Sequence, residues 1–366
     1  MRKGEVQIRR PGGKPGAWTV HDIAQVAGVS AKTVSRVVNK QSGVSEATRA
    51  RITQIIEDVG YHPHMGARIM RSSPRDCIGL TLSAPPNEVP FSQQVIQRIF
   101  AELYRIFGAK GDYVCLDLNP FRRNPNADYA RGLWEQRYGG CIVSGPLAIE
   151  DQSIVRIHRS GHPYIALGRL TDFPETSCAT VDFEEGAYLS TRFLLERGHK
   201  RIGLLQGFGR YHSGLERRHG YFRALAEAGI EPDESLIRPV TFGSRDIITG
   251  VHRLLADHAT TALIDSSGAE DAASVRDGAR RAGRVPGQDC DIVAWTYTDN
   301  ATVLSEACAH VWLPLDEAAV EGFDLLADWF HGLRDGPIHV VYPPTLYETI
   351  RSDEIPKPRP FFDVLR

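Results

Sequence analysis

The segment Thr19–Arg71 constrains the fold of this chain more than any other, because helix caps and helix breakers follow one another at short intervals. Three short helices are predicted, each after a Thr or Ser that can cap it: Val20–Ala27 after Thr19, Ala31–Val38 after Ser30, and a third from Ser45 to about Val59. Glycines after the first and third helices supply the stops. Two short helices separated by a glycine-containing turn are typical of a helix-turn-helix unit.

The second of these helices has a polar face that suits DNA. Ala31, Lys32, Ser35 and Arg36 are expected to face outward, whereas the three valines of the helix pack inward. Lys and Arg side chains can read guanine acceptors in the major groove. The alternative interpretation is a three-helix bundle that serves protein contacts.

The charge of the chain is unevenly distributed. The formal net charge is −2, but residues 1–75 contain 13 Lys and Arg against 5 Asp and Glu, a net of +8. The remaining residues hold 30 basic and 40 acidic side chains, a net of −10. A basic end attached to an acidic body is the pattern expected of a nucleic-acid-binding protein.

Several motifs of this segment resemble a known family. The motifs DIAQVAGVSAKTVSRVVN, VSEATRARI and GYHP are similar to the headpiece of the lactose-repressor (LacI/GalR) family of transcription regulators. The resemblance implies that Lys32 and Arg36 read bases in the major groove, while other residues position the DNA backbone. The full set of residues expected to contact double-stranded operator DNA is Thr19, Ser30, Ala31, Lys32, Thr33, Ser35, Arg36, Asn39, Arg68 and Met70.

Two flanking segments are interpreted from the same resemblance and from composition. Residues 62–75 correspond to the family's hinge helix, which orders on DNA, and Met70 stands at the position of its minor-groove wedge. His64 and Gly66 depart from the family pattern, and a plain linker is the alternative. Residues 1–17 form a basic arm, expected to be flexible, that either adds phosphate contacts or is a poorly ordered leader.

From Cys77 onward, short apolar runs alternate with amphipathic segments, which favours parallel sheets covered by helices on both faces. The number of such units indicates an α/β body of two doubly wound subdomains. The strands are expected at Cys77–Leu82, Tyr113–Leu118, Gly140–Ser144, Pro163–Leu167, Ala179–Val181, Arg201–Leu205, Thr261–Ile264, Asp291–Trp295 and Val311–Leu313.

The body is similar to the family's periplasmic-binding-protein-like effector domain at residues 181–205, 217–229 and 314–326. The resemblance implies three crossings between the subdomains, which we place near Val181, Val311 and Val340. The boundaries expected are a headpiece at 18–61, subdomain one at 76–181 plus 312–339, subdomain two at 182–311 plus 340–350, and a tail at 351–366.

A ligand is expected at the carboxyl ends of the strands, in the cleft between the subdomains. The candidate effector-binding residues are Phe91, Ser92, Ser144, Arg169, Arg217, Ser267, Trp295 and Thr296. Arg217 occupies the arginine position of the family's R-x-x-G-[FW] motif, with a surface arginine as the alternative. Trp295 offers a stacking surface or a core side chain. The acidic and amide residues that grip sugar hydroxyls in the family are replaced or shifted here, for example by Asp265-Ser266-Ser267.

Other classes of function find little support. No catalytic or phosphate-binding motif is present, and the six cysteines are scattered without a Cys-x-x-Cys pair, so neither an enzyme nor a cofactor or metal site is expected. No stretch approaches 18 apolar residues, and the N-terminus lacks the apolar region of a signal peptide.

The sequence therefore predicts a cytoplasmic DNA-binding transcriptional repressor that works as a homodimer or homotetramer. Its partners would be operator DNA and a small-molecule effector such as a sugar or related metabolite. Two alternatives are a small-molecule binding protein with a non-functional headpiece and an enzyme built on the same two-lobed body.

Overall fold

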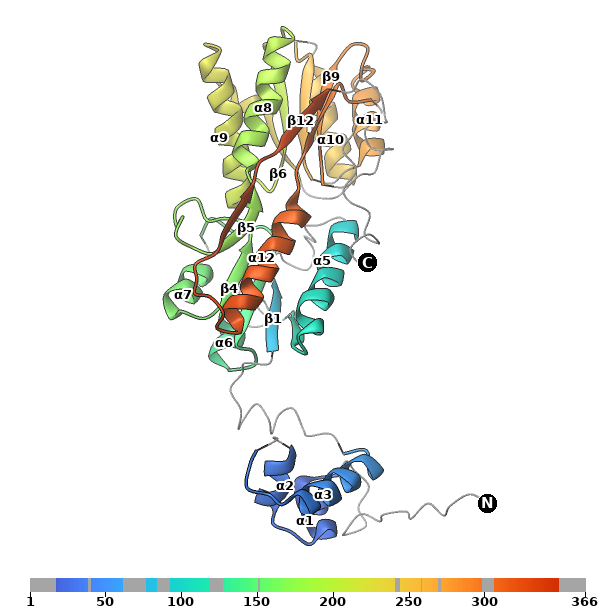
Figure 1. The fold of residues 1–366 in the computed structure, drawn as a ribbon. Helices are drawn as coiled ribbons and strands as arrows, with labels where there is room; N and C mark the ends of the chain where they lie inside the picture. Colours follow the sequence, from blue (N-terminus) through green and yellow to red (C-terminus); the bar gives the residue numbers. More distant parts are fainter. Residues whose placement is uncertain are drawn as a thin grey trace, which may run out of the picture. The chain divides into compact units, whose positions relative to one another are not determined.

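The computed structural model describes residues 18–38, 41–61, 77–83, 93–118, 128–150, 152–240, 244–257, 259–268, 271–297 and 306–348. The chain divides into two units, residues 1–73 and 74–366, each considered separately (Figure 1). Several predicted features lie outside the described residues: the arm at 1–17, the hinge at 62–75 with Arg68 and Met70, Asn39, Phe91, Ser92, and the tail at 351–366.

The first unit is the predicted bundle of three helices, α1 (Val20–Ala27), α2 (Ala31–Val38) and α3 (Glu46–Asp58). The caps explain the boundaries. Thr19 and Asp22 form a capping box, in which the Asp22 amide donates to Thr19 Oγ1 at 3.2 Å and the Thr19 amide donates to Asp22 Oδ2 at 2.9 Å. Gly28 then ends α1 in a left-handed conformation, with φ of 62°.

Six parallel strands form the first sheet of the second unit, in the order β11-β5-β4-β3-β1-β2. The strands are β1 (Cys77–Leu82), β2 (Tyr113–Asp117), β3 (Gly140–Ser144), β4 (Tyr164–Leu167), β5 (Cys178–Val181) and β11 (His339–Tyr342). The helices are α5 (Gln93–Leu103), which continues as a π-helical turn η1 (Tyr104–Gly108), α6 (Arg131–Trp134), α7 (Ser153–Ser160) and α12 (Leu315–Phe330).

The second sheet has the order β12-β10-β9-β8-β6-β7 and is parallel except for β12, which runs antiparallel to β10. Its strands are β6 (Ile202–Gly207), β7 (Ile237–Val240), β8 (Ala262–Ser266), β9 (Asp291–Thr296), β10 (Ala309–Trp312) and β12 (Thr345–Glu348). The helices are α8 (Phe183–Glu196), α9 (His212–Glu227), α10 (Ser244–Ala256), α11 (Ala272–Arg281) and the short η2 (Glu234–Leu236).

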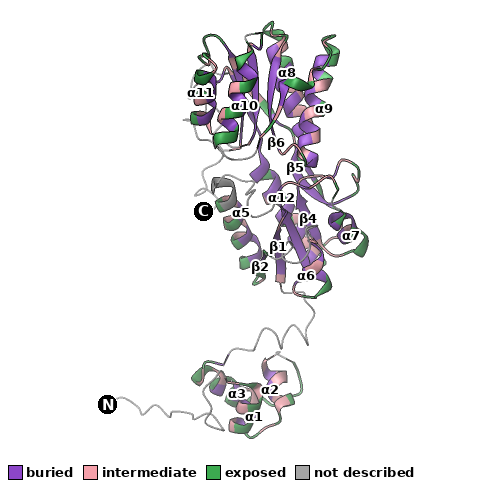
Figure 2. Ribbon diagram, turned by 180° about the vertical axis from the view of Figure 1, so that it is seen from behind, coloured by how far each residue is buried: buried purple, intermediate pink, exposed green. Residues whose placement is uncertain are grey.

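Both sheets are covered by helices on their two faces, so the inner strands are buried while the outer faces of the helices are exposed (Figure 2). One close contact sets the packing of α8 on α9. A Cβ atom on Gly220 would lie 1.9 Å from the Glu184 carbonyl oxygen, so only glycine allows the two helices to approach this far.

The chain crosses between the sheets three times, after β5, after β10 and after β11. The third crossing lies further along the chain than the sequence analysis placed it. Residues 340–342 were expected in the second subdomain, but Val340 pairs with Ala179 in the first sheet, so the crossing falls between Tyr342 and Thr345.

Candidate functional site

The outward face of α2 carries the residues predicted to meet DNA. Lys32 is exposed and Arg36 is half-buried, whereas Val34 and Val37 form part of the headpiece core. Ser30 and Thr33 also support the helix start, because the Thr33 amide donates to Ser30 Oγ at 3.1 Å. The helix therefore presents basic side chains on a surface that its own cap and core hold in place.

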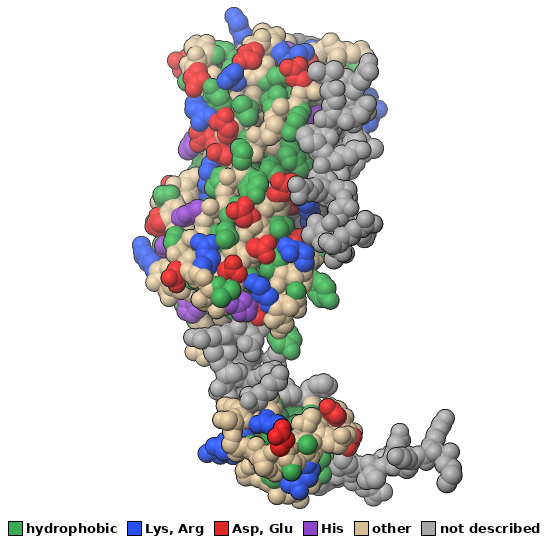
Figure 3. All heavy atoms as spheres, viewed as in Figure 1, with side chains coloured by type: hydrophobic (Ala, Val, Ile, Leu, Met, Phe, Trp, Pro, Cys, Tyr) green, Lys and Arg blue, Asp and Glu red, His purple; other side chains and the backbone are tan. Residues whose placement is uncertain are grey.

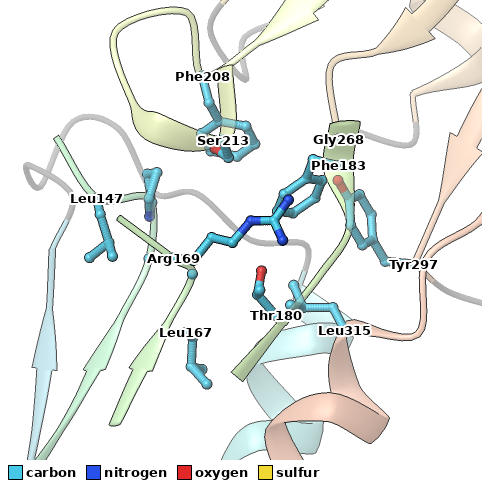
Figure 4. A pocket seen from close by; sticks show the side chains of 13 residues that line it. Leu147, Leu167, Arg169, Thr180, Phe183, Phe208, Ser213, Gly268, Tyr297 and Leu315 are labelled. Atoms are coloured by element: carbon cyan, nitrogen blue, oxygen red, sulfur yellow. The ribbon is translucent and has the colours of Figure 1, made fainter. Parts of the chain in front are cut away.

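A cleft in the second unit lies between the two subdomains at the carboxyl ends of the strands (Figure 4). Its unfilled space, counted together with its open mouth, is about 620 Å³. The lining is mostly apolar and aromatic and comes from both subdomains: Gly145, Pro146, Leu147, Leu167, Gly168, Arg169, Thr180, Phe183, Phe208, Ser213, Gly268, Tyr297 and Leu315.

Arg169, directly after β4, points into the middle of this cleft (Figure 4). Its side chain is 28% exposed and pairs with two carboxylates. Nη2 donates to Asp182 Oδ1 at 3.1 Å, and Nε donates to Glu216 Oε1 on α9. Because Glu216 belongs to the second subdomain, this ion pair connects the two subdomains across the cleft.

A second connection lies beside this ion pair. The side chains of Thr171 and His212 are joined by a 2.9 Å hydrogen bond between Oγ1 and Nδ1, and the His212 amide donates to the Leu147 carbonyl at 3.0 Å. These contacts also run from the first subdomain to the second, so the start of α9 is anchored to the opposite wall of the cleft.

Glu216 is almost completely buried, and this burial raises the pKa of its carboxyl to about 7, although the nearby Arg169 and Arg217 guanidinium groups lower it. Part of the Glu216 population is therefore protonated near neutral pH. In that state Arg169 keeps Asp182 as a charged partner, while Glu216 is neutral.

Arg217 is fully buried among aromatic rings directly behind the cleft wall. Its Cζ lies 4.4 Å from the ring centre of Phe183, 5.1 Å from Trp295 and 5.2 Å from Phe208. Nη1 donates to the Ser213 carbonyl at 2.8 Å and Nη2 donates to the Tyr297 hydroxyl at 3.2 Å, while Nε has no partner. Burial lowers the pKa of this guanidinium. The alternative of a surface arginine is therefore wrong.

The predicted effector residues occupy different positions around the cleft. Of those described, Arg169 lines it, and Ser144, Ser267 and Thr296 are buried one residue before the lining residues Gly145, Gly268 and Tyr297. Trp295 is a core side chain, stacked on Phe183 with ring centres 6.3 Å apart, and its Nε1 donates to Ser190 Oγ at 3.0 Å.

Sequence reasoning missed three aromatic wall residues, Phe183, Phe208 and Tyr297. Phe208 had a usable sequence signal, because it stands between Gly207 and Gly209; in the structure it adopts a left-handed φ of 61°. Phe183 and Tyr297 follow strands β5 and β9 within a few residues, as cleft residues of parallel sheets do.

No group of three or more His, Cys, Asp or Glu side chains within the described residues is arranged to hold a metal ion. In the same part of the chain, none of the helices has the length and apolar character that crossing a bilayer requires.

Comparison with known proteins gives two family matches and several whole-chain relatives. Residues 19–64 match bacterial regulatory proteins of the lacI family, and residues 77–307 match periplasmic binding proteins and the sugar binding domain of the LacI family. The chain is 27% identical over 346 residues to the transcriptional repressor PurR of Yersinia pestis (strain Pestoides F), covering 90% of this chain and 95% of that protein.

The regulator GalR of Escherichia coli (strain K12) is 28% identical over 228 residues, which is 62% of this chain but only 64% of GalR. A solved complex of the transcriptional regulator CelR with cellobiose is 26% identical with a TM-score of 0.62, covering 90% of this chain and 98% of that one. The lac repressor dimer bound to operator and the anti-inducer ONPF shares the fold, with a TM-score of 0.69, 22% identity, and coverage of 91% and 98%. The chain therefore belongs to the LacI family of DNA-binding bacterial transcription regulators.

Proposed function

We propose that this protein is a cytoplasmic repressor that binds operator DNA through α2. A small molecule bound in the cleft lowers or raises its affinity for the operator. The observation that carries the proposal is the exposed polar face of a capped recognition helix, in a segment with a net charge of +8. Lys32 and Arg36 read bases, with Ala31 as a small apolar contact, while Ser30, Thr33 and Ser35 position the backbone. Thr19 is a further DNA contact.

Binding of an effector in the cleft controls the affinity of the protein for operator DNA. Arg169 joins the two subdomains through Asp182 and Glu216, and an effector that binds between them alters this connection. A ligand shifts the balance between two subdomain arrangements only if it binds one of them more tightly. The protein thus acts as a switch, and its chemistry is binding rather than catalysis.

We propose that the protein works as a homodimer. An apolar edge surface lies on α5, η1, the edge strand β2 and the residue that follows it, and is formed by Phe100, Tyr104, Val114, Leu116 and Leu118. Tyr104 is 82% exposed and Leu116 45%, and hydrophobic side chains protrude beside the lower end of α5 (Figure 3). Exposed apolar residues along an unpaired edge strand favour association with a second copy.

Binding to a DNA fragment from its own promoter, measured at several salt concentrations, tests the proposed function. Specific binding is expected, with a loss of roughly 10³-fold or more in affinity between about 50 and 200 mM salt if a dimer neutralises six or more phosphates. Equal affinity for promoter and unrelated DNA at every salt concentration would contradict the proposal.

Arg36→Ala is expected to cost about 1–3 kcal/mol in operator binding and to relax preference at one base pair of each half-site, because a base contact is lost. Binding should be compared on operators that carry each of the four base pairs at that position. Arg51→Ala, which removes an exposed arginine from α3, serves as the matched control. A uniform loss of affinity on all four operators would assign Arg36 to phosphate contact instead.

A further inference from the structure

The cleft offers aromatic faces and hydrogen-bond donors, but its described carboxylates are already engaged. Phe183, Phe208 and Tyr297 provide the aromatic walls, and both Asp182 and Glu216 accept from Arg169. A polyhydroxyl ligand brings many O–H donors into this space, and each buried donor left without an acceptor costs about 1–3 kcal/mol. The acceptors that the described lining side chains offer to such a ligand are the neutral hydroxyls of Thr180, Ser213 and Tyr297.

The one charged side chain among the described lining residues is that of Arg169. Arg169 uses Nε and Nη2 for its two carboxylates, and its guanidinium lies at the centre of the cleft between walls of both subdomains (Figure 4). Arg217, behind Phe183 and Phe208, donates only to the neutral oxygens of Ser213 and Tyr297 and keeps Nε without a partner. A buried cation whose hydrogen bonds end on neutral oxygens is stabilised by an anion nearby.

The charge and the shape of the cleft both bear on the class of ligand that it binds. Arg169 lines the cleft between its two carboxylate partners, and protonation of Glu216, whose pKa burial raises to about 7, leaves this guanidinium with one charged partner, which favours a negatively charged ligand. The flat rings of the walls favour a flat apolar body, since aromatic rings gain from stacked or edge-on contacts with one another. The leucines at 147, 167 and 315 complete an apolar lining around it.

We propose, on the basis of the regulator function above, that the effector is a small aromatic carboxylate. Its ring lies among Phe183, Phe208 and Tyr297, and its carboxylate accepts hydrogen bonds from Arg169. The cleft, with about 620 Å³ of unfilled space including its mouth, accommodates a single substituted ring.

Calorimetric titration of the full-length protein without DNA tests the ligand class. Benzoate, 4-hydroxybenzoate and trans-cinnamate are the probes, benzamide is the neutral control of the same shape, and galactose and cellobiose represent sugars. At least one carboxylate is expected to bind, with the matching amide weaker by about tenfold or more. The proposal is overturned if no carboxylate binds at millimolar concentration, if benzamide binds as tightly as benzoate, or if a sugar binds more tightly than every carboxylate.

Two variants test whether Arg169 is the residue that binds the carboxylate of the ligand. Arg169→Met is expected to weaken binding of the best carboxylate by about tenfold or more. Arg218→Met is the control, because Arg218 lies on α9 beside Arg217 but pairs with Glu234 and is not part of the cleft lining. This control variant is expected to bind the carboxylate with unchanged affinity. If thermal melting shows that Arg169→Met does not fold, Arg169→Lys takes its place, because it keeps the charge beside Glu216 but loses the planar fork. Wild-type affinity in a folded Arg169 variant contradicts the assignment.

Operator binding measured on the same preparations separates the two proposals. Carboxylate binding without specific operator binding removes the regulator function and leaves the ligand class intact. Specific operator binding without carboxylate binding removes only the ligand class.

Discussion

Replacing Ile52 with alanine is expected to abolish operator binding while the α/β body stays folded. Ile52 is fully buried in α3, where it packs in one core with Ile23 and Val34 from the other two helices. Truncating a buried isoleucine costs about 2–5 kcal/mol, because a cavity remains where the side chain was. A bundle of this small size has little stability in reserve, so the loss is large enough to unfold it.

Circular dichroism during heating measures the stability of the headpiece and of the α/β body. A gel shift measures operator binding. The body has separate cores, so its melting transition should not move. Ile56→Ala is the matched control, because this isoleucine lies on the same helix but is only half-buried. It should lose less stability and keep operator binding. Full operator affinity in Ile52→Ala would show that the headpiece does not depend on this core.

Leu116→Asp is expected to convert the proposed dimer into a monomer and to weaken operator binding by roughly 10²–10⁴-fold, because two linked headpieces bind one operator far more tightly than one does. Val114 and Leu116 alternate along β2 and so share one face of the edge strand, and the exposed Leu118 follows directly after its end. A charge in the middle of this face would be buried without a partner in a dimer.

Sedimentation velocity measures whether the variant is a monomer or a dimer, and titration of the same sample with operator DNA measures its affinity. Leu333→Asp provides the control, because Leu333 is 74% exposed in the turn after α12 and lies outside the apolar edge surface. It should remain dimeric with unchanged operator affinity. A dimeric Leu116→Asp variant would place the interface elsewhere on the chain.

The headpiece could be predicted almost completely from sequence, because its boundaries depend on local chemistry. Thr19, Ser30 and Ser45 cap helices through side-chain contacts within three residues, and Gly28 ends α1 through its own backbone conformation. The predicted ranges of the three helices agree closely with the structure.

The body was predicted less evenly, since three of its strands depend on partners distant in sequence. The expected strands were found with small shifts, but β7, β11 and β12 were missed. β7 contains Pro239 and lies at a sheet edge, while β11 and β12 are four residues long and only partly buried. Short segments of this kind have too weak a pattern to be assigned without knowledge of the neighbouring strand.

The sequence locates the candidate effector residues along the strands, but it does not give the direction of their side chains. Arg169 follows a strand and lines the cleft, whereas Ser144, Ser267 and Thr296 follow or end strands and are buried. One residue decides whether a side chain faces the cleft or the sheet, because successive residues point to opposite sides.

The position of β11 affects how the protein can be made. Ile338 donates to Ser177 across 161 positions of the chain, and β11 completes the first sheet only by pairing with β5. During synthesis, β5 therefore remains an open sheet edge until residues 339–342 have left the ribosome, and such edges are sites of aggregation. A nascent chain that stops before His339 leaves this lobe unfinished, so the DNA-binding headpiece can be complete well before the part that controls it.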